Sequence, residues 1–149
     1  MRIQYKYIII FVWMTLIFML SAEGAHESKA RSSVIVGFVK ESLNIDFAED
    51  FLSFLVRKSA HIIAYFILGL IIYSTIKTYN LTSRRTIVLS IILAFLYAVF
   101  DEIHQLFVPG RSGEVRDVFI DTAAASIGVY AYLLFNRKYH TRKISKDRI

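Results

Sequence analysis

Apolar residues are concentrated in four blocks along the chain, separated by stretches that carry most of the charge. The blocks are Tyr7–Leu20, Ser59–Ile76, Thr86–Phe107 and Val118–Phe135. At about 1.5 Å of rise per residue, a helix of roughly 20 residues crosses the roughly 30 Å hydrocarbon core of a bilayer. The pattern therefore predicts an all-α membrane protein with four transmembrane helices, at about residues 5–22, 58–77, 86–108 and 117–136.

The first block is the shortest, and two interpretations of it stay open. Arg2 and Lys6 precede it and the small and polar residues Ser21–Gly24 follow it, which is typical of a cleaved signal peptide. Ile3 and Tyr5 lengthen the apolar stretch and favour a retained helix. Both interpretations place the N-terminus in the cytoplasm.

The stretch from Ser21 to Lys58 is too long for a simple connector. Two sets of apolar residues in it recur at helical spacing: Val34, Ile35, Phe38 and Val39 after a Ser32–Ser33 cap, and Phe47, Phe51 and Phe54 after Asp46. We therefore expect short interfacial helices in this first outer loop. They are expected to cover the mouth of the bundle, with ligand binding as the alternative.

Composition supports a membrane protein and excludes several other classes. Hydrophobic residues make up 56% of the chain, against about 45–50% in soluble proteins. With 149 residues, the chain is long enough for one domain, spanning 1–149. There is no cysteine, which excludes disulfides, thiol catalysis and Cys-ligated metals. We predict no cofactor and no metal site.

The distribution of charge predicts the orientation. With both termini cytoplasmic, the inner side carries eleven basic residues and one acid, a net +10, while the outer side carries seven basic residues and eleven acids, a net −4. This agrees with the positive-inside rule. It predicts a multi-pass protein of the cytoplasmic membrane with a basic cytoplasmic tail at 137–149. The aromatic residues lie mostly in the spans rather than beside a basic groove, so we predict no nucleic-acid partner.

Ionisable residues in the spans are costly in hydrocarbon, by roughly 2.5–3.5 kcal/mol at a helix centre, and they are therefore candidates for function. In this chain they fall on helical stripes at the outer ends of three spans. Lys58, His61 and Tyr65 form one stripe, Asp101, His104 and Gln105 a second, and Asp117 and Asp121 a third. Glu102 is rotated about 100° from Asp101. We predict that these groups meet in one outer-leaflet layer.

Two further features concern the ends and faces of these spans. The segment Val108–Gly113 is a tight connection, because Pro109 fixes φ and its glycines permit positive φ. It is expected to fold Arg111 over Asp101 and Asp117 as a bidentate fork. Ala124 and Gly128 form a small-residue face that predicts close helix packing. The alternative role of the polar layer is structural, in which its charges neutralise one another and fix helix register.

Three runs of this sequence resemble the VanZ-like family: RKSAHIIAY at 57–65, DEIHQLFVPGR at 101–111 and DVFIDT at 117–122. Trp13 through Ser21 also resembles the family's first span and the serine that follows. The resemblance covers roughly residues 8 to 135. It implies a glycopeptide (teicoplanin)-resistance-type or other envelope-related role for an integral membrane protein. The matching motif positions are Lys58, His61, Tyr65, Asp101, Glu102, His104, Gln105, Arg111, Asp117 and Asp121.

The sequence is compatible with three functions. The leading hypothesis is a non-catalytic envelope protein whose outer polar pocket binds a lipid-linked cell-wall precursor or a glycopeptide. A membrane-embedded enzyme is the second, because His61, Asp101, Glu102 and His104 offer acid–base groups. A scaffold that docks another membrane protein is the third. Membrane lipids are expected partners in every case.

Overall fold

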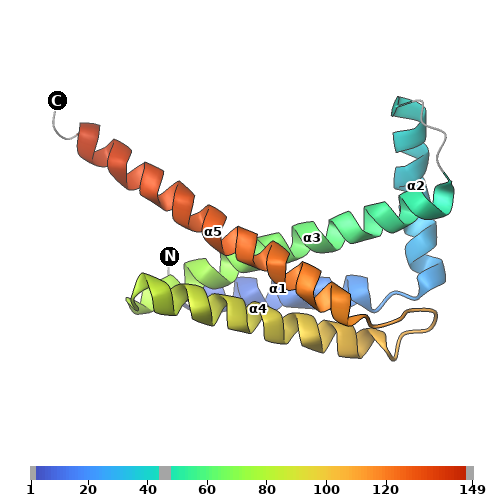
Figure 1. Cartoon of the computed structure of the whole chain (residues 1–149), viewed down its shortest axis with the longest axis horizontal. Coiled ribbons are helices and arrows are strands. Elements are labelled where there is room, and N and C mark those ends of the chain that lie inside the picture. The colour runs from blue at the N-terminus through green and yellow to red at the C-terminus, as the bar shows by residue number, and fades with distance from the viewer. Residues whose placement is uncertain (1–2, 44–47, 147–149) are drawn as a thin grey trace.

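The computed structural model describes residues 3–43 and 48–146, and its regular elements are helices (Figure 1). They are α1 (Ile3–Ser21), α2 (Ala25–Leu43), α3 (Glu49–Ile76), the single 3-10 turn η1 (Lys77–Tyr79), α4 (Ser83–Gln105) and α5 (Val115–Lys146). Four of them, α1, α3, α4 and α5, are long and apolar enough to cross a membrane. The predicted all-α fold with four candidate spans is confirmed.

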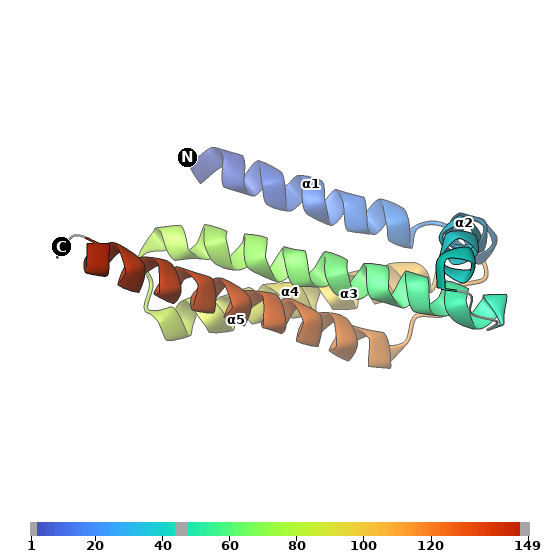
Figure 2. The same ribbon diagram turned by 90° about the horizontal axis from the view of Figure 1, so that it is seen from above.

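The long helix α3 is the centre of the bundle. It contacts α1, α2, α4 and α5, and its contact with α5 is the most extensive. The helix α2 runs crosswise to the others at one end of the bundle, and α1 begins and α5 ends at the opposite end (Figures 1 and 2). The connection between α4 and α5 lies at the same end as α2. This end is called the α2 end below.

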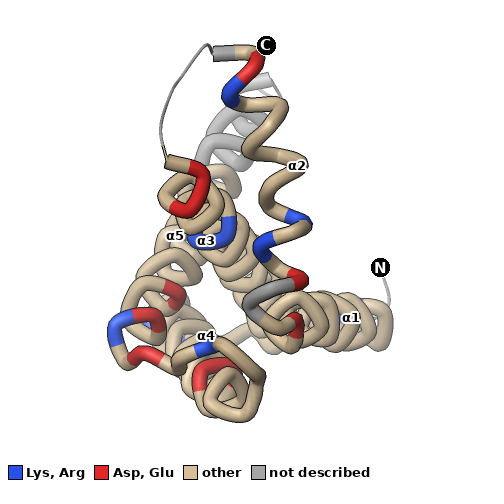
Figure 3. The backbone as a smooth tube through the Cα atoms, turned by 90° about the vertical axis from the view of Figure 1, so that its right-hand side faces the viewer, with Lys and Arg blue, Asp and Glu red and all other residues tan. Residues whose placement is uncertain are grey.

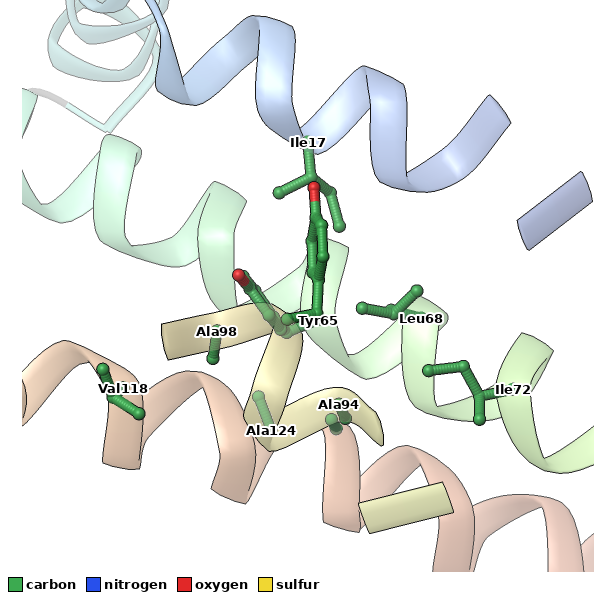
Figure 4. Packing of buried hydrophobic residues seen from close by; sticks show 10 residues of the cluster. Ile17, Tyr65, Leu68, Ile72, Ala94, Ala98, Val118 and Ala124 are labelled. Atoms are coloured by element: carbon green, nitrogen blue, oxygen red, sulfur yellow. The ribbon is translucent and has the colours of Figure 1, made fainter. Parts of the chain in front are cut away.

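The buried core lies where α1, α3, α4 and α5 meet (Figure 4). Tyr65, Leu68 and Ile72 extend from α3 at helical spacing, and each is at most 4% exposed. Alanines of α4 and α5 pack against them, which allows the helices to approach closely. The exposed surfaces of the same helices are also apolar, as expected for helices whose solvent is lipid.

The closest approach is between α3 and α5, and it depends on the predicted small-residue face. A Cβ placed on Gly128 would lie 2.1 Å from the carbonyl oxygen of Phe66. A Cβ on Gly69 would lie 2.0 Å from the carbonyl oxygen of Ala125. Both glycines therefore allow backbone-to-backbone contact that no other residue permits. The packing predicted from Ala124 and Gly128 is confirmed, and Gly69 is its partner on α3.

The second span begins earlier than predicted. The expected start was residue 58, but α3 starts at Glu49, so Phe51 and Phe54 lie in its first turns instead of in a separate interfacial helix. Glu49 and Asp50 in the first turn favour this start, because carboxylates stabilise a helix N-terminus. With 28 residues, α3 is about 42 Å long and exceeds the hydrocarbon core. Asp46 and Phe47 lie outside the described residues.

The segment before it, where we expected short interfacial helices, forms one longer helix of 19 residues. It begins at Ala25, so the predicted cap at Ser32–Ser33 is wrong. Both serines lie inside α2, where their hydroxyls donate to the carbonyl oxygens of Lys29 and Ala30. The helix packs across α3, while Phe38 remains 72% exposed.

The ends of the last two spans also differ from the prediction. The third was expected to reach residue 108, but α4 ends at Gln105, and Leu106–Val108 continue as hydrogen-bonded turns. The fourth was expected to end near residue 136, and α5 continues through the first part of the predicted tail to Lys146. Lys6, close to the start of α1, donates to the carbonyl oxygen of Ser74 near the end of α3, at 2.8 Å.

Candidate polar cleft at the α2 end

Acidic and basic positions of α3, α4 and α5 lie together at the α2 end (Figure 3). Two pairs join α3 to α5 there. Lys58 forms an ion pair with Asp117, and one turn deeper Nδ1 of His61 lies 3.8 Å from Oδ2 of Asp121. The i, i+3 spacing on α3 matches the i, i+4 spacing on α5, because both separations are close to one helical turn. The predicted meeting of these two stripes is present in the structure.

A third contact joins α3 to α4. The hydroxyl of Tyr65 donates to Oδ2 of Asp101 at 3.2 Å, and both side chains are fully buried. The other carboxylate oxygen, Oδ1, is buried without a hydrogen-bond partner among the described residues. Oγ of Ser21, at the end of α1, lies beside the Asp101 carboxylate and is also buried without a hydrogen bond of good geometry. Such groups are costly to bury, so Asp101 and Ser21 are candidates for contact with water or a ligand.

Glu102 holds the α4–α5 connection against the end of α4. One of its carboxylate oxygens accepts the backbone N–H of Glu114 at 2.8 Å, and the other accepts from Nε2 of Gln105 at 3.3 Å. The connection can come this close because it has a glycine at residue 113, where a Cβ would lie 2.4 Å from the carbonyl oxygen of Glu102. Gly110, with φ of 73°, supplies the turn.

Arg111 is near the other charged residues, but its predicted fork over Asp101 and Asp117 is wrong. Its Nε donates to the carbonyl oxygen of Glu23 at 3.1 Å, which ties the α4–α5 connection to the connection between α1 and α2. No ion pair joins Arg111 to either aspartate in the described part of the chain. Burial lowers the pKa of the guanidinium, and the nearby charge of Arg57 lowers it further.

His104 is separated from the other predicted residues. Its ring packs on Phe18 of α1, with the ring centroids 4.2 Å apart, and its Nδ1 is buried without a described partner. It therefore faces α1, whereas Asp101 faces Tyr65 on α3.

Side chains of α3, α4, α5 and the α4–α5 connection, most of them charged or polar, line a cavity of about 250 Å³, which we call the polar cleft. Its lining residues are Phe54, Arg57, Lys58, His61, Glu102, Gln105, Gly110, Arg111, Ser112, Glu114, Asp117 and Asp121. Seven of the ten predicted residues belong to this lining. Tyr65 and Asp101 lie deeper in the bundle, where they bond each other, and His104 lies beside α1.

Arg57 is a cleft residue that the predicted set left out. It precedes His61 by four residues, so helical spacing places the two side chains on one face of α3, and this signal was present in the sequence. Ser112 and Glu114 also line the polar cleft, but they come from a connection whose path no periodicity specifies. The described residues contain no group of three or more His, Asp or Glu arranged to hold a metal ion.

Four candidate spans, a crosswise helix and a charged cleft at one end define a polytopic membrane protein with a polar site built into its helix ends. The profile of the VanZ/LLP1 family matches residues 6–136, which include most of the first span, the central bundle of α3 and α4, α5 up to residue 136, and every cleft residue. The chain therefore belongs to the VanZ/LLP1 family. No curated protein sequence and no solved structure matches the chain.

Proposed function

We propose that this VanZ-family protein resides in the bacterial cytoplasmic membrane and binds a lipid-linked ligand of the cell envelope in its polar cleft, in a glycopeptide (teicoplanin)-resistance-type role. The observation that carries the proposal is the polar cleft itself, which gathers ionisable side chains from α3, α4 and α5 at one end of an apolar bundle. In a lipid-facing bundle such groups are costly, and they are typical of functional sites.

The charge distribution supports an outward-facing cleft. The predicted inner side is net +10 and the predicted outer side net −4, and the cleft lies at the end where the segments predicted to be outside meet. This orientation places both termini in the cytoplasm and α2 at the outer surface of the membrane. A ligand would then reach the cleft from the outer leaflet.

The size of the cleft supports a head group as its occupant. Pockets for drug-sized ligands have volumes of about 300–1,000 Å³. The polar cleft, at about 250 Å³, is smaller, so it matches part of a ligand and not an entire glycopeptide antibiotic. We infer that it holds the polar group of a lipid-linked cell-wall precursor, which lowers access of other molecules to that precursor.

Teicoplanin susceptibility tests this proposal in strains that express the parent or a cleft variant, with the amount of each protein in the membrane measured. We expect Asp121→Asn and Lys58→Met to abolish the protection that the parent gives, because each removes one member of an α3–α5 pair. Glu27→Gln is the matched control, because Glu27 is an exposed residue at the same end of the bundle, and this variant should retain protection. Unchanged protection by both cleft variants would contradict the proposal, and so would loss of both proteins from the membrane, which would assign the pairs to folding.

One observation favours an enzyme as the second candidate. Nδ1 of His61 lies 3.8 Å from Oδ2 of Asp121 in the cleft. A histidine beside a carboxylate is a common acid–base arrangement. Purified protein incubated with radiolabelled lipid-linked precursors separates the two functions. Chemical conversion that His61→Gln abolishes would establish the enzyme, whereas retention of unchanged precursor supports binding.

A further inference from the structure

A second cavity adjoins the polar cleft, between α1, α2 and α3. It has a volume of about 120 Å³, and we call it the apolar groove. Its apolar lining residues are Ile17, Leu20, Ile35, Val56, Ala60 and Ala64. Leu20 and its neighbours Glu23 and Arg31 also border an open surface of α1 whose other residues are mainly exposed apolar side chains. The apolar groove is therefore continuous with a part of α1 suited to contact lipid tails.

Three residues line both cavities: Arg57, His61 and Arg111. Arg57 and His61 come from one face of α3, and Arg111 comes from the α4–α5 connection. The boundary between the polar cleft and the apolar groove is thus formed by two guanidinium groups and an imidazole. A molecule that occupied both cavities would have to pass these groups.

The carboxylates around this boundary already have partners of their own. Glu23 pairs with Arg31, and Asp117 pairs with Lys58. Glu114 pairs with Arg116 at 2.8 Å, and Glu102 accepts the backbone N–H of Glu114. Glu23, Asp117 and Glu114 therefore have cationic partners other than the two guanidinium groups at the boundary, whereas Glu102 has neutral hydrogen-bond donors.

The two arginines, in contrast, form no ion pair among the described residues, and Glu23, Asp101 and Glu102 act on Arg111 only at longer range. Within residues 3–43 and 48–146, no carboxylate oxygen lies within 4.0 Å of Arg57 or Arg111 nitrogens. Nε of Arg57 donates to the carbonyl oxygen of Ser53 at 3.4 Å, and Nε of Arg111 donates to that of Glu23. Each bond uses one of the five N–H donors of a guanidinium, which leaves donors for an anion.

We propose that a phosphate group of an amphiphile binds between Arg57 and Arg111, with its apolar chain in the apolar groove and the rest of its head group in the polar cleft. The inference rests on the proposed function and specifies the chemical class of its ligand. A phosphate has several oxygens and can accept from two guanidinium forks at once. The chain leaves the apolar groove along α1 towards the bilayer.

Native mass spectrometry of the purified protein in neutral maltoside detergent measures this binding directly. The probes are dodecyl phosphate, the neutral alcohol dodecanol and inorganic phosphate. We expect the parent to bind one dodecyl phosphate and to bind dodecanol and inorganic phosphate far more weakly. Arg57→Gln and Arg111→Gln should each weaken dodecyl phosphate binding by about 10- to 100-fold, as expected for lost hydrogen bonds to a charged group.

Two further variants separate the site from general effects of charge and folding. Lys40→Gln removes a cation of α2 that lines neither cavity and forms no ion pair among the described residues, so it should bind dodecyl phosphate like the parent. Ala60→Phe fills the apolar groove while the cleft residues stay, so it should weaken binding of the amphiphile. The melting temperature of each variant, measured in the same detergent, identifies any that does not fold.

Several results would overturn the inference. If dodecanol bound as tightly as dodecyl phosphate, the phosphate group would have no role in binding. If inorganic phosphate bound as tightly as dodecyl phosphate, the apolar chain would have no role. If Lys40→Gln weakened binding as much as Arg57→Gln or Arg111→Gln, the effect would be one of net charge and not of the two arginines at the boundary. Absence of dodecyl phosphate binding to a folded parent would refute the phosphate site. The proposed function would survive that result if Asp121→Asn still abolished teicoplanin protection, and would fall separately if it did not.

Discussion

Replacing Gly128 with alanine tests whether the contact between α3 and α5 holds the polar cleft together. The new Cβ would lie 2.1 Å from the carbonyl oxygen of Phe66, about 1.3 Å short of the 3.4 Å at which ordinary contacts begin. Both contacting groups belong to helix backbone, so neither can rotate away. The two helices must therefore separate by about 1 Å at this point.

The size of the effect follows from two opposing contributions. Overpacking of a well-packed interior costs about 1–3 kcal/mol, and contact with backbone favours the upper end of that range. Alanine in place of glycine inside a helix gains about 1 kcal/mol. The net loss is therefore about 2 kcal/mol, which corresponds to a decrease in melting temperature of about 4–8 °C for a chain of this size.

Thermal unfolding of the detergent-purified variants provides the assay. Gly37→Ala is the matched control, because Gly37 lies inside α2 and a Cβ placed on it would meet nothing within 4 Å. We expect Gly37→Ala to unfold at the same temperature as the parent or higher. Because the Lys58–Asp117 and His61–Asp121 pairs join the same two helices, Gly128→Ala should also impair ligand binding. Equal melting temperatures for Gly128→Ala and Gly37→Ala would refute this account of the packing.

Three other predictions concern orientation and individual cleft residues. A cysteine at the exposed Ser33 should react with an impermeant thiol reagent in intact cells, and a cysteine at the exposed Ser83 should not. The natural chain has no cysteine, so no other residue reacts. The reverse labelling pattern would contradict the predicted orientation. Arg111→Lys should reduce teicoplanin protection at matched protein level although the charge is kept, because lysine lacks the planar donor fork; full protection would show that charge alone suffices. His104→Phe should preserve both teicoplanin protection and melting temperature, because the ring of His104 packs on Phe18. His61→Phe should abolish protection. Equal loss of protection in both variants would show that His104 belongs to the functional site.

Helical periodicity was sufficient to predict the part of the site that lies on α3 and α5. Lys58 and His61 recur one turn apart, as do Asp117 and Asp121, so two helices in register pair them without any further information. The spans and the small-residue face were predictable for the same reason, because each depends on regular spacing along one helix.

Features set by the rotation of a helix or by a loop could not be predicted in this way. Residues three apart differ by about 60° around a helix, so Asp101 can face Tyr65 while His104 faces Phe18. Glu102, about 100° from Asp101, faces the α4–α5 connection. Nothing local to Arg111 specifies the carbonyl of Glu23 as its partner, because that contact spans 88 residues of sequence.

The early start of α3 had a different cause. The charged residues between 49 and 58 lower the hydropathy of this segment. Hydropathy predicts where a helix enters the membrane, not where the helix begins. Phe51 and Phe54 continue the helical pattern beyond the apolar block, as part of the two turns that precede Lys58. These turns add Phe54 and Arg57 to the polar cleft.

Photocrosslinking from inside the polar cleft shows whether a lipid-linked precursor occupies it. A photoreactive phenylalanine at Ser112, an exposed cleft residue, should crosslink a radiolabelled lipid-linked cell-wall precursor in membranes that contain the protein. The same group at Ser33, which is exposed on α2 and does not line the cleft, controls for lipid that is merely nearby. We expect a crosslinked precursor from Ser112 that is absent in the Asp121→Asn variant and absent when the photoreactive group is at Ser33. Equal crosslinking from both positions, or none from Ser112, would contradict it.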